Sequence, residues 1–182
     1  SASFTNMSGA LFNNMSLVNK IYFPREVLVL AAMLARFMDF LISVVLLAIL
    51  MFIYQVPFTL TAMIWLPIIL FIQFILIVGL GLALSAANVF FRDVSSLLAL
   101  GLQLWFYASP IIYPITSVPE SLRTLYFLNP MAGIIEAYRS VILEAHAPDY
   151  MALGIAAIVS VIAFVGGYWF FKRVEFRFAD IV

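Results

Sequence analysis

Arg36 and Asp39 are the ionisable residues best placed to do chemistry, because both lie within a long apolar stretch. A spacing of three residues puts both side chains on one face of a helix, where they can pair. Charged groups inside a membrane span are costly and often functional. We favour the simpler interpretation, an intramembrane ion pair near the cytoplasmic end that faces other helices. The other apolar stretches carry no mid-depth carboxylates, which argues against a proton relay.

The remaining polar motifs do not form a nucleotide or metal site. No Gly-Lys dipeptide occurs, so the chain lacks the phosphate-binding loop of many ATPases. Gly79-Leu80-Gly81 lacks the third glycine of a dinucleotide fingerprint. His146 is the single histidine and cysteine is absent, so no metal site is predicted. We expect no cofactor and no catalytic residue in this chain.

The amino-acid composition indicates that the chain lies in a membrane. Hydrophobic residues make up 66% of the 182 residues and charged residues 10%. Soluble domains are about 45–50% apolar and about 25% charged. The bilayer is therefore the natural solvent, and membrane lipid is a partner. A net charge of zero gives no bias toward nucleic acid, which we do not expect as a partner.

Runs without charge define the expected spans, because about 20 apolar residues cross the hydrocarbon core. Phe40–Phe91 is too long for one span, and Gln55 and Pro57 mark a turn within it. Only helices satisfy the backbone of such segments in lipid. The expected spans cover residues 27–54, 59–91, 94–108 and 150–171.

The basic residues orient the spans. Those assigned to one side are Lys20, Arg25, Arg92, Lys172, Arg173 and Arg177, whereas the other side holds only Arg123 and Arg139. We therefore expect residues 1–26 and the C-terminus to be cytoplasmic and residues 117–149 to be external. After Asn129-Pro130, apolar residues recur on one helical face, which predicts an amphipathic helix that lies at the outer interface or folds back against the bundle.

The sequence begins Ser-Ala-Ser, without an initiator methionine or a charged segment leading an apolar run. This start is not that of a signal peptide. We expect a single membrane domain, residues 1–182, whose upstream spans are missing. The predicted fold class is all-α: a polytopic helical membrane protein with four complete transmembrane helices, the end of a truncated one, and short external re-entrant or interfacial helices.

Small residues recur at every fourth position at Gly79, Ala83 and Ala87. This spacing lets two helices approach closely, either within the subunit or at a subunit interface. We favour packing within the subunit.

An aromatic segment ends the third expected span. Its candidate residues for a translocation path or gate are Trp105, Tyr107, Pro110, Tyr113 and Pro114. The two prolines break the helix at the outer face. The aromatics are typical of an interfacial belt, and the alternative is a pore exit whose rings stack on sugars.

An apolar cluster lies between basic residues on the cytoplasmic side. The segment comprises Lys20, Ile21, Tyr22, Phe23, Pro24, Arg25 and Glu26. Pro24 holds Phe23 in an extended conformation and begins a new helix. Exposed Ile-Tyr-Phe indicates a docking site for a partner, or else an interfacial anchor.

This segment resembles the cytoplasmic turn of type-2 ABC exporter permeases, most closely the branch that exports O-antigen, capsule and teichoic acid polymers. Further matches follow in the expected order across nearly the whole chain. They are Asp39-Phe40, Asn88–Asp93, Ser109–Pro114, Asn129-Pro130 and Phe178–Asp180.

The resemblance implies an ATP-driven exporter in the inner membrane, built from two permease copies and two separate ATPase subunits that bind ATP and Mg²⁺. It implies that residues 13–26 form the coupling segment that contacts the ATPase, and that residues 109–149 form an external gate segment. The implied substrate is a polysaccharide or lipid-linked glycan. The alternatives are a type-2 permease for a drug or another lipid, or a non-transporting membrane scaffold.

Overall fold

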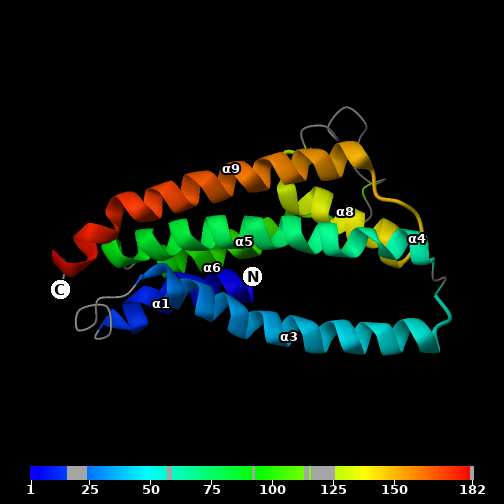
Figure 1. The fold of residues 1–182 in the computed structure, drawn as a ribbon, viewed down its shortest axis with the longest axis horizontal. Coiled ribbons are helices and arrows are strands. Elements are labelled where there is room, and N and C mark those ends of the chain that lie inside the picture. Colours follow the sequence, from blue (N-terminus) through cyan, green and yellow to red (C-terminus); the bar gives the residue numbers. More distant parts are fainter. Residues whose placement is uncertain (16–23, 57–58, 92, 113–114, 116–125, 181–182) are drawn as a thin grey trace. The chain divides into compact units, whose positions relative to one another are not determined.

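The computed structural model describes residues 1–15, 24–56, 59–91, 93–112, 115 and 126–180. The elements in these residues are all helical (Figure 1). They are α1 (Ala2–Asn13), α3 (Glu26–Ile53), α4 (Leu60–Met63), α5 (Trp65–Phe90), α6 (Val94–Tyr107), α8 (Pro130–Ile142), α9 (Tyr150–Val174) and the 3₁₀ helix η2 (Glu175–Asp180).

Three of these helices are long and apolar enough to cross a membrane: α3, α5 and the segment Tyr150–Phe178, which contains α9. The prediction of a polytopic helical membrane protein is therefore confirmed. Helix α6 has 14 residues, and at about 1.5 Å per residue it spans less than the roughly 30 Å of hydrocarbon. Four complete spans and a truncated one remain a prediction.

Turn residues and proline mark the ends of the helices. Helix α3 stops at a turn in which Gln55 adopts a left-handed φ of 52°, and Val56 N donates to Met51 O at 3.0 Å. The segment expected as one helix over 59–91 contains two, α4 and α5. Pro67 lies in the first turn of α5, where a residue without an N–H is tolerated.

The described chain divides into two compact units. The first contains residues 1–47, 77–102 and 163–182, and the second contains residues 48–76 and 103–162. Four helices, α3, α5, α6 and α9, contribute a segment to each unit. The two candidate sites below lie one in each unit.

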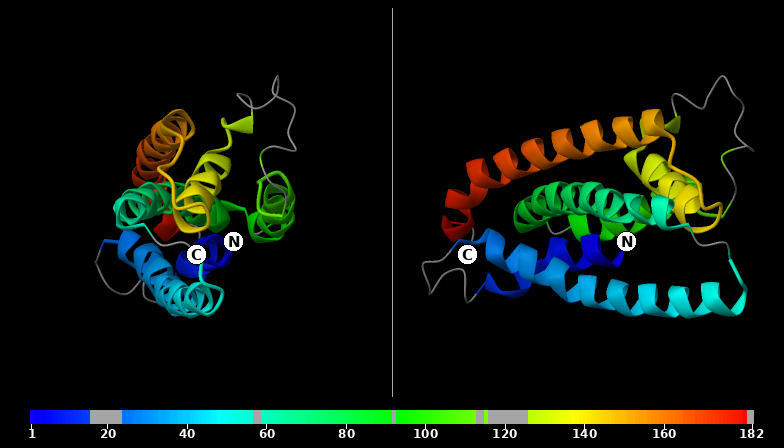
Figure 2. Two further views of the ribbon diagram at one scale, coloured as in Figure 1. Left: turned by 90° about the vertical axis from the view of Figure 1, so that its right-hand side faces the viewer. Right: turned by 45° about the vertical axis from the view of Figure 1, so that its right-hand side comes forward.

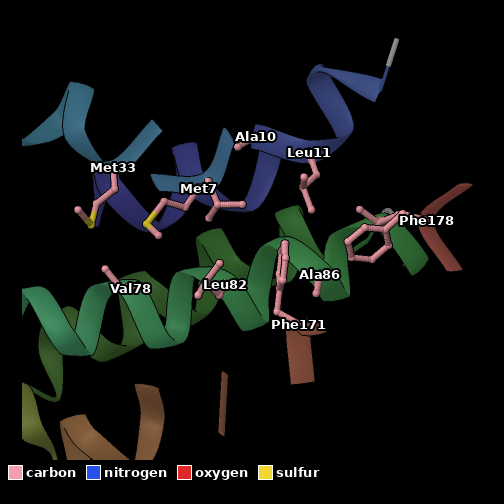
Figure 3. Close-up of a cluster of buried hydrophobic side chains, with 11 residues drawn as sticks. Met7, Ala10, Leu11, Met33, Val78, Leu82, Ala86, Phe171 and Phe178 are labelled. Atoms are coloured by element: carbon pink, nitrogen blue, oxygen red, sulfur yellow. The ribbon is translucent and has the colours of Figure 1, made fainter. Parts of the chain in front are cut away.

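The core of the first unit is an apolar cluster drawn from four helices and the tail (Figure 3). Its members are Met7, Ala10, Leu11, Val29, Met33, Val78, Leu82, Ala86, Val89, Phe171 and Phe178. Helix α1 also bonds to α5, because Asn88 Nδ2 donates to the buried Ser8 carbonyl at 3.1 Å.

Glycines bring α5 and α9 into backbone contact within the first unit. A Cβ added at Gly167 would overlap the carbonyl oxygen of Gly79, and one added at Gly79 would overlap the backbone of Phe164. Gly79 therefore packs inside this chain, in line with the favoured interpretation of the small residues.

Candidate functional sites

The first site is the start of α3, which carries the described part of the expected coupling segment. Lys20, Ile21, Tyr22 and Phe23 lie outside the described residues. Pro24 and Arg25 directly precede α3, and their carbonyls accept from its first turn: Val27 N donates to Pro24 O at 3.1 Å and Leu28 N donates to Arg25 O at 3.3 Å. Nothing in the structure tests docking by the apolar cluster, which stays a prediction.

Arg25 and Glu26 contact the C-terminal tail. Arg25 Nη1 donates to the Glu175 carbonyl, and the Arg25 guanidinium lies 5.7 Å from the centre of the Phe178 ring. Lys172 Nζ lies 2.9 Å from Glu26 Oε1 and 3.1 Å from Glu175 Oε2. The start of α3 is therefore joined to the end of the chain.

Arg36 and Asp39 lie side by side on α3, with Arg36 Nη1 2.8 Å from Asp39 Oδ2. The side chains are 40% and 60% exposed. Asn6, with its amide oxygen turned toward the guanidinium, accepts a hydrogen bond from Arg36 Nη2 at 2.9 Å. This geometry joins α1 to α3 and suits a structural pair; its depth in a membrane stays a prediction.

The second site is the end of α6, where the side chain of Asn129 makes four hydrogen bonds with described residues. Its Oδ1 accepts from Trp105 Nε1 at 2.8 Å and from Met131 N at 3.1 Å. Its Nδ2 donates to Ala108 O at 3.3 Å and to Ser109 Oγ at 3.1 Å. Asn129 thus caps α8 and ties it to α6.

Arg139 on α8 adds a second connection to this segment. Its Nη2 donates to the carbonyl of the buried Pro110 at 2.9 Å, and its Nη1 lies 3.0 Å from Glu136 Oε2. Burial raises the pKa of Glu136 above 4.5; Arg139 opposes the rise and Glu144 adds to it. An amphipathic helix is expected to expose its polar face, whereas the Arg139 and Glu136 side chains are only 20% and 16% exposed.

Helix α8 also contacts α5 and α9 within the second unit (Figure 2). Tyr138 Oη donates to Gln73 Oε1 at 2.7 Å, and burial raises the pKa of Tyr138. A Cβ added at Gly133 would lie 2.6 Å from the Ala152 carbonyl oxygen. Three helices therefore hold α8.

The aromatic residues proposed for a path or gate have different environments. Trp105 is half-buried and bonded to Asn129. Tyr107 is exposed and stacks edge-on against Phe106 at 5.6 Å. Tyr113 and Pro114 lie outside the described residues. Trp105 therefore has a structural role in holding α8, and the choice between belt and pore exit stays open.

His146 completes the end of α8. Its backbone N donates to Ser140 O at 3.0 Å, next to Ala145 in a left-handed conformation. The side chains of Glu144 and His146 are exposed. Among the described residues, no group of three histidine, cysteine or acidic side chains is arranged to hold a metal ion.

Comparison with known proteins places these features in context. The family model described as ABC-2 type transporter matches residues 3–143. The chain is 28% identical over 181 residues to the O-antigen export system permease protein RfbA of Klebsiella pneumoniae, an alignment covering 100% of this chain and 70% of the relative. It is 29% identical over 184 residues to the protein of the same name from Myxococcus xanthus, with the same coverage.

Proposed function

Because this chain belongs to the ABC-2 type transporter family, we propose that it is the membrane subunit of an ATP-driven exporter in the cell inner membrane. Its cargo is a polysaccharide or a lipid-linked glycan, carried from the cytoplasm. The observation that carries the proposal is the match to the family model over residues 3–143. Similarity to relatives named O-antigen export permeases over the full chain favours a glycan over a drug or another lipid.

The transport subunit needs separate ATPase subunits, which bind ATP and Mg²⁺. The absence of a Gly-Lys dipeptide from the sequence supports this division of labour. We further propose that two copies of the permease form a homodimer and that the C-terminus is cytoplasmic. The basic residues Lys172, Arg173 and Arg177 near the C-terminus support that orientation.

The coupling segment contacts the ATPase in this proposal. Tyr22 and Phe23 supply rigid aromatic area, as anchor residues at interfaces do. If they are the anchors, replacing both with alanine weakens the complex by about 2–4 kcal/mol. Copurification of the double variant with its ATPase measures this loss. Normal copurification and normal export would favour interfacial anchoring instead.

Depletion of the permease in cells tests which class of substrate it exports. When the permease is depleted, lipid-linked glycan should accumulate on the cytoplasmic side, and the wild-type gene should reverse the accumulation. Depletion of an unrelated inner-membrane transporter is the control. Unchanged glycan distribution together with drug sensitivity would favour the drug-permease alternative.

A further inference from the structure

The C-terminal tail returns to the base of the coupling segment. Arg25 donates from Nη1 to the backbone oxygen of Glu175, a residue 150 positions later in the chain. The same guanidinium lies over the Phe178 ring at 5.7 Å. A backbone acceptor and an aromatic face together restrict where Arg25 can lie.

A second connection lies beside the first. The Lys172 ammonium group lies between two carboxylates, 2.9 Å from Glu26 and 3.1 Å from Glu175. Glu26 is the first residue of α3, and Lys172 is in the last turn of α9. The start of α3 is therefore held at two consecutive residues.

Phe178 anchors these connections in the protein interior. Its side chain is 0% exposed. Its ring lies 5.8 Å from the ring of Phe90 at the end of α5 and 5.8 Å from the ring of Phe171 on α9. The tail is consequently part of the apolar core of the first unit (Figure 3).

We propose that the C-terminal tail, residues Glu175–Phe178, is a clamp that fixes the base of the coupling segment to α5 and α9, with Phe178 and Lys172 as positioning residues for energy coupling. The proposal rests on the proposed function, because it assigns the coupling role to the segment before α3. Motion of the ATPase reaches the membrane helices only if the junction between the coupling segment and α3 is stiff, since a flexible junction would absorb the motion.

The tail itself offers matched variants. Phe178→Leu keeps an apolar side chain but removes the ring beneath Arg25, whereas Phe178→Ala also opens a cavity. Phe176→Ala is the control, because Phe176 is 76% exposed in the same short helix. Lys172→Met removes the ammonium group and keeps the stem, and Arg173→Met controls for loss of a neighbouring positive charge, since Arg173 stacks on Trp169 at 4.9 Å.

Hydrogen exchange of the purified full-length permease tests the clamp directly. Phe178→Leu should accelerate exchange of the amides in the first two turns of α3 by about tenfold, the size expected for loss of a desolvated cation–π contact. Exchange in the rest of α3 should not change, and Phe176→Ala should match the wild type. Wild-type exchange in Phe178→Leu would overturn the clamp.

The second measurement is the amount of glycan transported per ATP hydrolysed by the complete exporter in proteoliposomes. Phe178→Leu and Lys172→Met should lower this ratio severalfold while ATP hydrolysis continues, and the Phe176→Ala and Arg173→Met exporters should keep it. Faster hydrogen exchange in α3 together with an unchanged ratio of glycan to ATP would overturn the coupling role. The tail would then contribute to packing alone. If the wild-type exporter transports no glycan, the proposed function fails, and with it the coupling role, whereas the exchange result still decides the clamp.

Discussion

Among single residues, Asn129 is the one that ties α8 to the end of α6, because its amide bonds to Trp105, Ser109 and the Ala108 carbonyl. Asn129 next to Pro130 predicts a helix break, but the distant partners of its amide are visible only in the fold. Trp105 and Ser109 precede it by 24 and 20 positions. Pairings over such separations depend on tertiary packing, which local patterns do not encode.

Replacing Asn129 with alanine should destabilise the protein by about 1–2 kcal/mol through the lost cap, and further because the Trp105 N–H loses its Asn129 partner. The thermal unfolding midpoint in detergent measures this effect. Asn13→Ala is the control, since Asn13 is exposed at the end of α1. Equal midpoints for the two variants would refute the role of Asn129.

Glu136 makes a pH-dependent contribution to stability. Burial raises the pKa of its carboxyl above 4.5 in the folded protein, so the folded state binds this proton more tightly than the unfolded state. The resulting stability is fully present below pH 4.5 and is lost as the pH rises through the folded-state pKa.

Glu136→Gln should remove this part of the pH dependence. The unfolding midpoints of the wild type and the variant are measured between pH 4 and pH 8. As the pH rises, the midpoint of the wild type should fall relative to that of Glu136→Gln, because only the wild type loses the proton of Glu136. A constant difference between the two proteins across that range would show that Glu136 titrates normally.

At the level of elements, apolar runs predict helices well, because charge is costly inside a span and only a helix satisfies the backbone hydrogen bonds there. The helix expected over residues 27–54 is observed as Glu26–Ile53, and that expected over 150–171 as Tyr150–Val174. The span expected over residues 59–91 contains the separate helices α4 and α5. Pro67 is the local signal for the second start, because proline is tolerated in the first turn of a helix. The contacts of α3 with the C-terminal tail could not be predicted either, because no local sequence pattern indicates pairing between residues so far apart in the chain.

The contact between α5 and α9 offers a test with adjacent residues. Gly167→Ala should destabilise the protein by about 1–3 kcal/mol, because the new methyl group overlaps the backbone at Gly79. Gly166→Ala should be neutral or stabilising, since nothing lies within 4 Å of a Cβ there and alanine favours helix. The free energies of unfolding of the two variants are measured in detergent. Equal values would show that α5 and α9 are not in backbone contact.

At the scale of the whole molecule, topology links the sequence to its proposed role. Residues 1–26 and the turn at Arg92-Asp93 should be cytoplasmic, and residues 117–149 external. Residues 1–182 contain no cysteine, so single cysteines introduced by Ser95→Cys and Ser121→Cys can be labelled separately in a full-length protein from which any other cysteine has been removed. An impermeant reagent added outside should label only the Ser121→Cys protein, and labelling of Ser95→Cys alone would invert the topology.

Reconstitution measures whether this permease exports a glycan with energy from a separate ATPase. Proteoliposomes containing the full-length permease and its ATPase should move a lipid-linked glycan across the bilayer when ATP and Mg²⁺ are added. Permease alone should neither hydrolyse ATP nor transport, and an ATPase variant unable to hydrolyse ATP should abolish transport. Equal glycan movement by the permease alone, or with the inactive ATPase, would show that the ATPase does not power the transport.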